Sequence, residues 1–170
     1  MFRLILITLF ILTSINNLNA SMTKEDLTKF IEKPMTLGKK DKNLPVWEIL
    51  DKNKEIHSYI FETFDLAPIA GFSGGKMNML VKMDIEGNFL DVQVLEQDEP
   101  VFVSGLGVLP FVEFLKQYKG KSLKNSIKVG ALKSSGNSVY IDGVSKATAS
   151  VKIANDSILA SSIKIAKEKL

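Results

Sequence analysis

Two neighbouring stretches of alternating hydrophobicity constrain the fold of this chain most strongly. In residues 77–84 the apolar Met77, Met79, Val81 and Met83 occupy every second position. The turn residues Ile85-Glu86-Gly87 follow, and residues 88–95 form the second stretch. Successive side chains of a strand point to opposite faces, so this pattern predicts an antiparallel hairpin with one face in the core.

Apolar spacing and turn residues predict the other elements. Thr23, with Asp26 three residues later, can cap a helix over residues 21–33, and Pro34 ends it. The further expected elements are strands over 46–50, 55–62 and 139–142, a helix over 110–119, an irregular stretch over 97–107 and a lysine-rich connection after Gly120. This order predicts an α+β domain, in which helices pack against an antiparallel sheet.

The C-terminal segment, residues 143–170, permits two interpretations. Residues 149–154 alternate well enough for a strand, with Asn155 starting a helix after it. We favour one helix that begins near Thr148.

The first 20 residues have the layout of a secretory signal peptide. Arg3 is followed by an apolar run and then by a polar stretch that ends at Ala20. The run is shorter than the ~20 apolar residues of a spanning helix. We therefore expect residues 1–20 to be removed and the mature chain to be secreted, into the periplasm, without a stable membrane span. The alternative is an uncleaved N-terminal anchor. Residues 21–64 then supply the N-terminal helix and first strands, and 65–170 the domain core.

The composition excludes several classes of site. The chain has no cysteine and a single histidine, His57, which excludes thiolate metal sites, iron–sulfur clusters and cysteine nucleophiles and leaves little material for histidine sites. Redox chemistry would need a bound organic cofactor. Arg3 is the only arginine, and arginine is the residue best suited to reading guanine edges, so we expect no nucleic-acid partner.

Three segments could carry chemistry. They are the loop 71–76 (GFSGGK), the stretch 96–100 (EQDEP) followed by Gly105-Leu106-Gly107, and residues 142–150 (DGVSKATAS). Each also has an ordinary interpretation: a turn, a solvated acidic face before a tight turn, and a helix N-cap. The last segment has a second possibility, because a phosphoester at Thr148 would be held by the first-turn N–H groups of a helix.

Taken in this order, the three segments resemble the FMN-binding domain shared by NosR/NirI-type proteins and the RnfG and NqrC redox subunits. The likeness covers about residues 65–168. Residues 142–150 resemble the flavinylation motif of the family, an Asp followed by Ser/Thr-Gly-Ala-Thr, with Lys146 in place of the glycine. Gly105-Leu106-Gly107 is similar to the Gly-Leu-Gly of the RnfG-like branch.

The resemblance implies an FMN-binding-domain-like fold with FMN attached to Thr148 through a phosphoester, installed by an ApbE-type flavin transferase. It implies no catalytic residue and no metal ligand. The implied cofactor-binding residues are Asp142, Ser145, Ala147, Thr148, Gly71, Phe72, Ser73, Gly74, Glu99, Gly105, Leu106 and Gly107.

The implied function is that of a NosR-like flavoprotein module for extracytoplasmic electron transfer. Its partners would be membrane or periplasmic redox proteins, and it would be an electron-transfer protein rather than a stand-alone enzyme. The alternative is a non-redox accessory or sensory domain that binds FMN loosely or not at all. A flavin reductase is a weaker interpretation, because the sequence has no nicotinamide-binding fingerprint.

Overall fold

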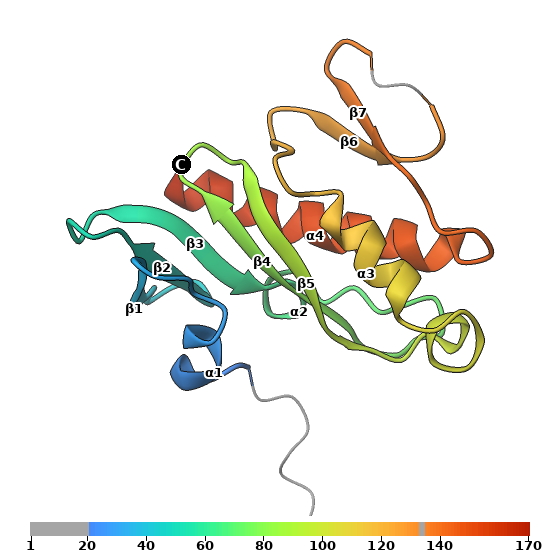
Figure 1. The fold of residues 1–170 in the computed structure, drawn as a ribbon, viewed down its shortest axis with the longest axis horizontal. Coiled ribbons are helices and arrows are strands. Elements are labelled where there is room, and N and C mark those ends of the chain that lie inside the picture. Colours follow the sequence, from blue (N-terminus) through green and yellow to red (C-terminus); the bar gives the residue numbers. More distant parts are fainter. Residues whose placement is uncertain (1–20, 133–134) are drawn as a thin grey trace, which may run out of the picture.

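A five-stranded antiparallel sheet forms the centre of the chain (Figure 1). The computed structural model describes residues 21–132 and 135–170. The sheet strands are β1 (Thr36–Lys40), β2 (Val46–Leu50), β3 (Ile56–Glu62), β4 (Met77–Asp84) and β5 (Phe89–Gln97), which pair in chain order. The helices are α1 (Lys24–Thr28), α2 (Thr63–Leu66), the π-helix η1 (Val101–Gly105), α3 (Leu109–Lys116) and α4 (Thr148–Lys169). The predicted α+β class is confirmed.

The hairpin of β4 and β5 follows the predicted alternation. Met77, Met79 and Met83 are fully buried in the main core with residues of α3 and α4. Leu80 packs instead into a smaller cluster with Leu27 of α1. Because neighbouring side chains of a strand face opposite sides, β4 is buried on both faces of the sheet.

Helix α4 lies along the sheet face that carries the methionines (Figure 1). Its buried residues are spaced as one helical face: Ser150, Val151, Ala154, Asn155, Ser157, Ile158, Ser161, Ser162 and Ile165. The single-helix interpretation is therefore confirmed, and a strand over 149–154 is wrong. The hydroxyl group of Tyr118 donates a 2.8 Å hydrogen bond to Asn155 Oδ1. Burial raises the pKa of Tyr118 far above its usual range, so the hydroxyl stays protonated as a donor.

Several short elements were not predicted. These are β1, α2, η1 within the stretch expected to be irregular, and β6 (Ser126–Val129) within the lysine-rich connection. β6 pairs in parallel with β7 (Ser138–Ile141) in a separate two-stranded sheet. Elements of four or five residues are too short to show a clear period in the sequence. The first helix is shorter than predicted: α1 ends at Thr28. Its predicted cap is present, since the Thr23 side chain accepts a hydrogen bond from the Asp26 N–H.

The predicted signal peptide lies outside the described residues. Within residues 21–132 and 135–170, no helix is both long and apolar enough to cross a bilayer.

An ion pair ties the end of α4 to the loop between β1 and β2. The Lys169 ammonium group contacts the Asp41 carboxylate, which also accepts hydrogen bonds from the backbone N–H groups of Asn43 (2.8 Å) and Leu44 (2.9 Å). Lys169 first, and then these two amides, lower the pKa of Asp41 from 3.8 to about 2. The contact therefore stabilises the folded chain only while Asp41 is ionised.

We expect Asp41→Asn to remove part of the acid sensitivity of the fold. Since folding lowers the pKa of Asp41, its stabilisation is present above pH 3.8 and is lost as the pH falls through about 2. Urea unfolding at a series of pH values should show a steeper loss in the wild type than in Asp41→Asn across this window. Parallel losses in the two proteins would contradict the assignment.

Candidate functional site

A cavity of about 600 Å³, here called the Thr148 cavity, lies where three separate parts of the chain meet. The hairpin brings two of them together, because Met77 at the start of β4 pairs with Gln97 at the end of β5. The loop before β4 and the segment after β5 therefore leave the sheet side by side, at the open end of the hairpin. The third part is the start of α4. The wall consists of Phe72, Ser73, Glu99, Pro100, Val101, Lys146, Ala147, Thr148, Ala149 and Ser150.

Glu99 connects these three parts. Only 2% of the residue is exposed. Its Oε1 accepts hydrogen bonds from the backbone N–H and the hydroxyl group of Ser73, both at 3.1 Å. Its Oε2 accepts a 2.5 Å hydrogen bond from the Ser150 hydroxyl. A buried carboxylate is costly unless donors satisfy it, so these contacts hold the loop and α4 against the hairpin.

Gly71 makes room for this carboxyl group. A Cβ at position 71 would lie 2.2 Å from Glu99 Oε1, so a side chain cannot be accommodated without movement. The Gly71 N–H also donates a 2.8 Å hydrogen bond to the Gly75 carbonyl, which closes the loop. Gly71 therefore shapes the cavity from behind its wall. Gly74 lies in the same loop but is not part of the wall.

The start of α4 has no ordinary cap. Ala147 is the N-cap residue and has no side-chain hydrogen bond to offer, and Thr148 is the first helical residue. The N-cap interpretation of the hydroxyl residues is therefore wrong. The first-turn N–H groups of a helix lack intrahelical partners, and its dipole favours an anion at this end. The exposed Thr148 lies in the cavity wall at this position.

Lys146 keeps the backbone conformation of a glycine. Its φ is +65°, in the left-handed region that side chains disfavour. The flavinylation motif that residues 142–150 resemble has glycine where this chain has Lys146, and the backbone of Lys146 still adopts a glycine-like shape. Lys146 is also part of the cavity wall.

Other predicted residues lie outside the wall. The Gln117 side chain holds the backbone of Asp142, accepting from its N–H at 2.7 Å and donating to its carbonyl at 3.0 Å. Asp142 lines a separate hollow beside α3. Ser145 is exposed and is not part of the Thr148 cavity. Gly105, Leu106 and Gly107 end and follow η1, which reaches the wall through Val101 alone.

The sequence did not assign Ser150 or Val101 to the site. Ser150 is one of several small residues at the start of α4, and only the packing shows that its hydroxyl group reaches Glu99. Val101 follows Pro100 directly, and its proximity in sequence to Glu99 was the only available signal.

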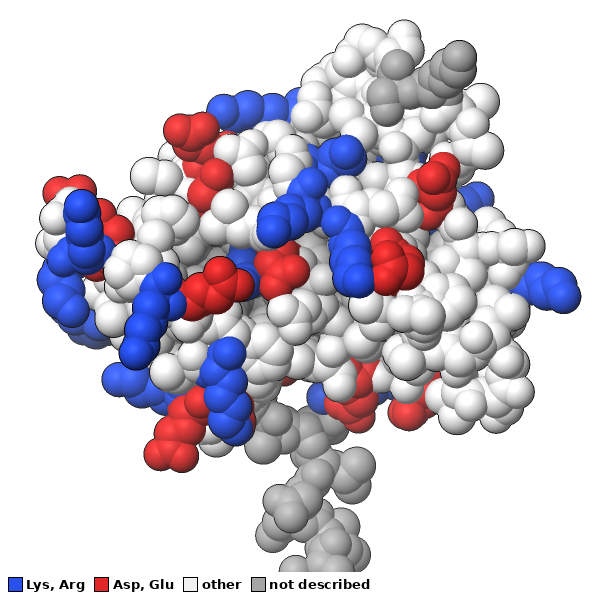
Figure 2. Space-filling view, viewed as in Figure 1, with Lys and Arg blue, Asp and Glu red and all other residues white. Residues whose placement is uncertain are grey.

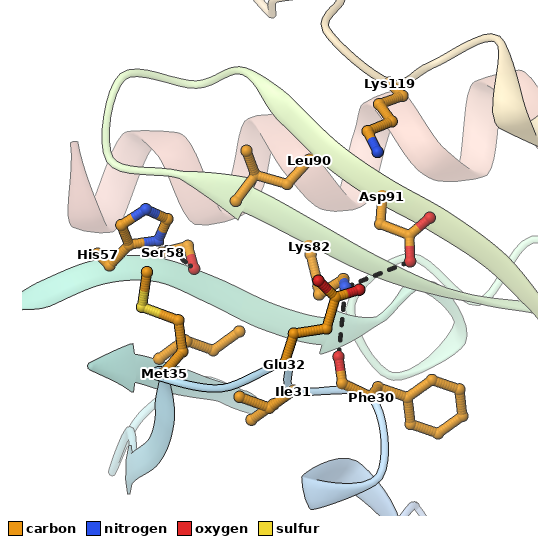
Figure 3. A pocket seen from close by; sticks show the side chains of 11 residues that line it. Phe30, Ile31, Glu32, Met35, His57, Ser58, Lys82, Leu90, Asp91 and Lys119 are labelled. Atoms are coloured by element: carbon orange, nitrogen blue, oxygen red, sulfur yellow. Dashed lines mark hydrogen bonds and ion pairs between the residues drawn. The ribbon is translucent and has the colours of Figure 1, made fainter. Parts of the chain in front are cut away.

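A second hollow, of about 400 Å³, lies on the opposite side of the sheet, beneath the segment that follows α1 (Figure 3). The Lys82 ammonium group there is already engaged, 3.3 Å from the Asp91 carboxylate and 3.2 Å from the Phe30 carbonyl. His57 lies at its edge, with Nδ1 3.2 Å from Ser58 Oγ. None of the predicted cofactor-binding residues lines this hollow, so the Thr148 cavity is the stronger candidate site.

An uncharged surface adjoins the Thr148 cavity. Residues 100–112 carry no charged side chain, and Figure 2 shows a white area at the lower right, where η1 and the start of α3 lie in Figure 1. At the left and centre of this face lysines and acidic residues are interspersed. Phe72 is 71% exposed and Val103 63% exposed. The cavity therefore opens beside an apolar surface rather than beside a surface of uniformly positive or negative charge.

Comparison with known proteins links the chain to NosR over part of its length. It is 27% identical to the regulatory protein NosR of Stutzerimonas stutzeri and 30% identical to that of Pseudomonas aeruginosa, over 81 residues in each case. Each match covers 48% of this chain, and only 11% of the relative. No protein-family model matches the chain. The chain is thus similar to a small part of a much longer protein.

We expect Glu99→Ala to destabilise the fold by about 2–4 kcal/mol, because three hydrogen bonds are lost and the buried Ser150 hydroxyl loses its acceptor. Gly71→Ala should cost at least about 2 kcal/mol, because the added Cβ displaces the same carboxyl group. Urea unfolding at neutral pH measures both changes.

Gly105→Ala is the matched control for Gly71→Ala. A Cβ at position 105 meets its nearest atom, the Pro100 carbonyl oxygen, at 3.8 Å. Its effect should stay within about 0.5 kcal/mol. Equal effects of the two glycine substitutions would show that Gly71 does not serve the Glu99 contact.

Lys146→Gly should stabilise the chain by up to about 1.6 kcal/mol. It removes a left-handed cost of about 1–2 kcal/mol, partly offset by the ~0.4–1 kcal/mol that a glycine loses through the unfolded state. Lys146→Ala keeps the strained backbone and should give no such gain in thermal or urea unfolding. A gain in both variants would point to the lost charge instead.

Proposed function

We propose that this chain is a flavoprotein module that carries FMN on Thr148 and transfers electrons outside the cytoplasm. One observation carries the proposal. Residues of all three segments that resemble the FMN-binding family meet in the wall of one cavity, with Thr148 in that wall. The sequence similarity to part of NosR supports a NosR-like relationship, which is the coarser part of this proposal.

The residues present fit a flavin. The cavity, at about 600 Å³, falls in the range of about 300–1,000 Å³ typical of small-molecule sites. Phe72 presents an exposed aromatic ring in the wall, and a planar ring system can stack on such a surface. The uncapped start of α4 offers N–H donors for a phosphate beside Thr148.

The protein residues bind and orient in this proposal, while the flavin supplies the electron-transfer chemistry. Glu99 fixes the loop and α4 at their hydrogen-bonded distances. Thr148 would tether the phosphate end of the cofactor, and Phe72 would offer its exposed ring as a surface for stacking. The exposed apolar surface of η1 leaves the rim open to a membrane or periplasmic redox partner.

The tether requires a second protein. In the proposed reaction an ApbE-type transferase uses FAD, and the Thr148 oxygen forms a new bond to the FMN phosphorus. The pyrophosphate bond of FAD breaks, AMP leaves, and the hydroxyl proton is released. The predicted signal peptide, residues 1–20, would place this reaction outside the cytoplasm.

One observation favours a second candidate function. Lys146 occupies the position of the motif's glycine, so the transferase could fail to accept this chain. The domain would then be an accessory or sensory module that binds FMN without a covalent bond, in keeping with the regulatory role named for NosR.

We expect the wild-type chain, secreted together with an active ApbE-type transferase, to give a flavin-fluorescent band on a denaturing gel. Thr148→Val keeps the shape of the side chain but lacks the hydroxyl group, so its band should be dark. Intact mass should rise by one FMN less one water in the wild type alone. Thr36→Val, the same substitution at an exposed position of β1, should stay fluorescent.

A dark wild-type band, from a transferase shown to modify another substrate, would contradict covalent attachment. Lys146→Gly would then decide the cause. Fluorescence restored in that variant would show that the lysine blocks the transferase, and the non-covalent module would become the better assignment.

A further inference from the structure

Lys146 is part of the wall of the Thr148 cavity, and its ammonium group forms no ion pair with a described residue. It is the single lysine among the ten residues that line the cavity. Its backbone is held in a left-handed conformation, at φ +65°, two residues before Thr148.

The one acidic side chain in the cavity wall does not pair with Lys146, so the ammonium group is available to bind an anion. Glu99 is the one acidic residue in the wall, and both of its carboxylate oxygens are occupied by Ser73 and Ser150. Helix α4 begins at Thr148 without a side-chain cap and with no acidic residue in its first turn. Lys146 and the positive end of the helix dipole therefore border the same cavity.

We infer that Lys146 pairs with the phosphate group of the flavin nucleotide and makes this cavity prefer FMN to riboflavin. The inference rests on the proposed function, since it concerns the same cavity and cofactor. A lysine at the start of a helix with free N–H donors suits a phosphate, which carries nearly two negative charges in free FMN at neutral pH and one when esterified to Thr148. The neutral isoalloxazine ring gives the lysine no comparable partner.

The test is a titration of the apo protein, produced without a transferase, with FMN and with riboflavin. Quenching of flavin fluorescence gives the dissociation constants for wild type, Lys146→Gln and Lys146→Arg. We expect Lys146→Gln to weaken FMN binding about fivefold, the effect of losing one partly exposed ion pair. Riboflavin binding should not change, and Lys146→Arg should bind FMN like the wild type.

Two controls separate charge from backbone and from general electrostatics. Lys146→Gly relaxes the left-handed backbone but also removes the ammonium group, so it should lose FMN affinity as Lys146→Gln does. Lys152→Gln removes an exposed lysine of α4 outside the cavity wall, and it should leave both affinities unchanged. Raising the salt concentration should weaken FMN binding more in the wild type than in Lys146→Gln.

The outcomes distinguish failure of this inference from failure of the proposed function on which it rests. If both flavins bind and Lys146→Gln weakens them equally or not at all, the role of Lys146 is overturned and the flavin site stands. If wild type binds neither flavin in the absence of the transferase, the role of Lys146 is overturned, and the flavin-fluorescent band of the chain secreted with the transferase still decides the proposed function.

Discussion

The site depends on one buried carboxyl group. Glu99 follows the end of β5, and its two oxygens bind the glycine-rich loop on one side and α4 on the other. A carboxylate removed from water needs several donors, and Ser73 and Ser150 supply them. These hydrogen bonds in turn constrain the surrounding chain. Gly71 must lack a side chain, and α4 must begin beside the loop, for the bonds to form.

The core gives this arrangement a rigid base. Met77, Met79 and Met83 are fully buried on the sheet face covered by α4, and Tyr118 binds Asn155 one helical turn beyond the cavity residues. The long helix therefore cannot shift along the sheet without breaking buried contacts. Thr148, as its first residue, takes its position from this packing together with the contact of Ser150 to Glu99.

In the proposed function, the same geometry would let a small domain hold a cofactor without catalytic side chains. The cavity wall combines a hydrogen-bonded carboxyl group, a lysine without an ion pair, an aromatic ring and the start of a helix. These groups can orient and hold a phosphorylated ring compound, and none of them has to transfer a proton. The uncharged surface beside the opening leaves room for a partner at the cavity rim.

The sequence by itself determined the hairpin. Alternation in β4 and β5 and the turn between them predicted their antiparallel pairing, and that pairing placed the loop containing Gly71 and Phe72 beside Glu99. Helical spacing favoured a single helix from Thr148. These signals are local or repeat with a short period, so they can be read along the chain. The short elements β1 and β6 gave no such signal.

Only the tertiary structure decided which motif residues share the cavity. Residues 142–150 form one continuous segment, yet Thr148 lies in the wall while Asp142 lies beside Gln117 and Ser145 outside. The Gly105–Gly107 turn is likewise separated from the wall by the course of η1. The contact of Ser150 with Glu99 joins residues 51 positions apart. Such contacts result from the packing of whole elements, which no local pattern of residues specifies.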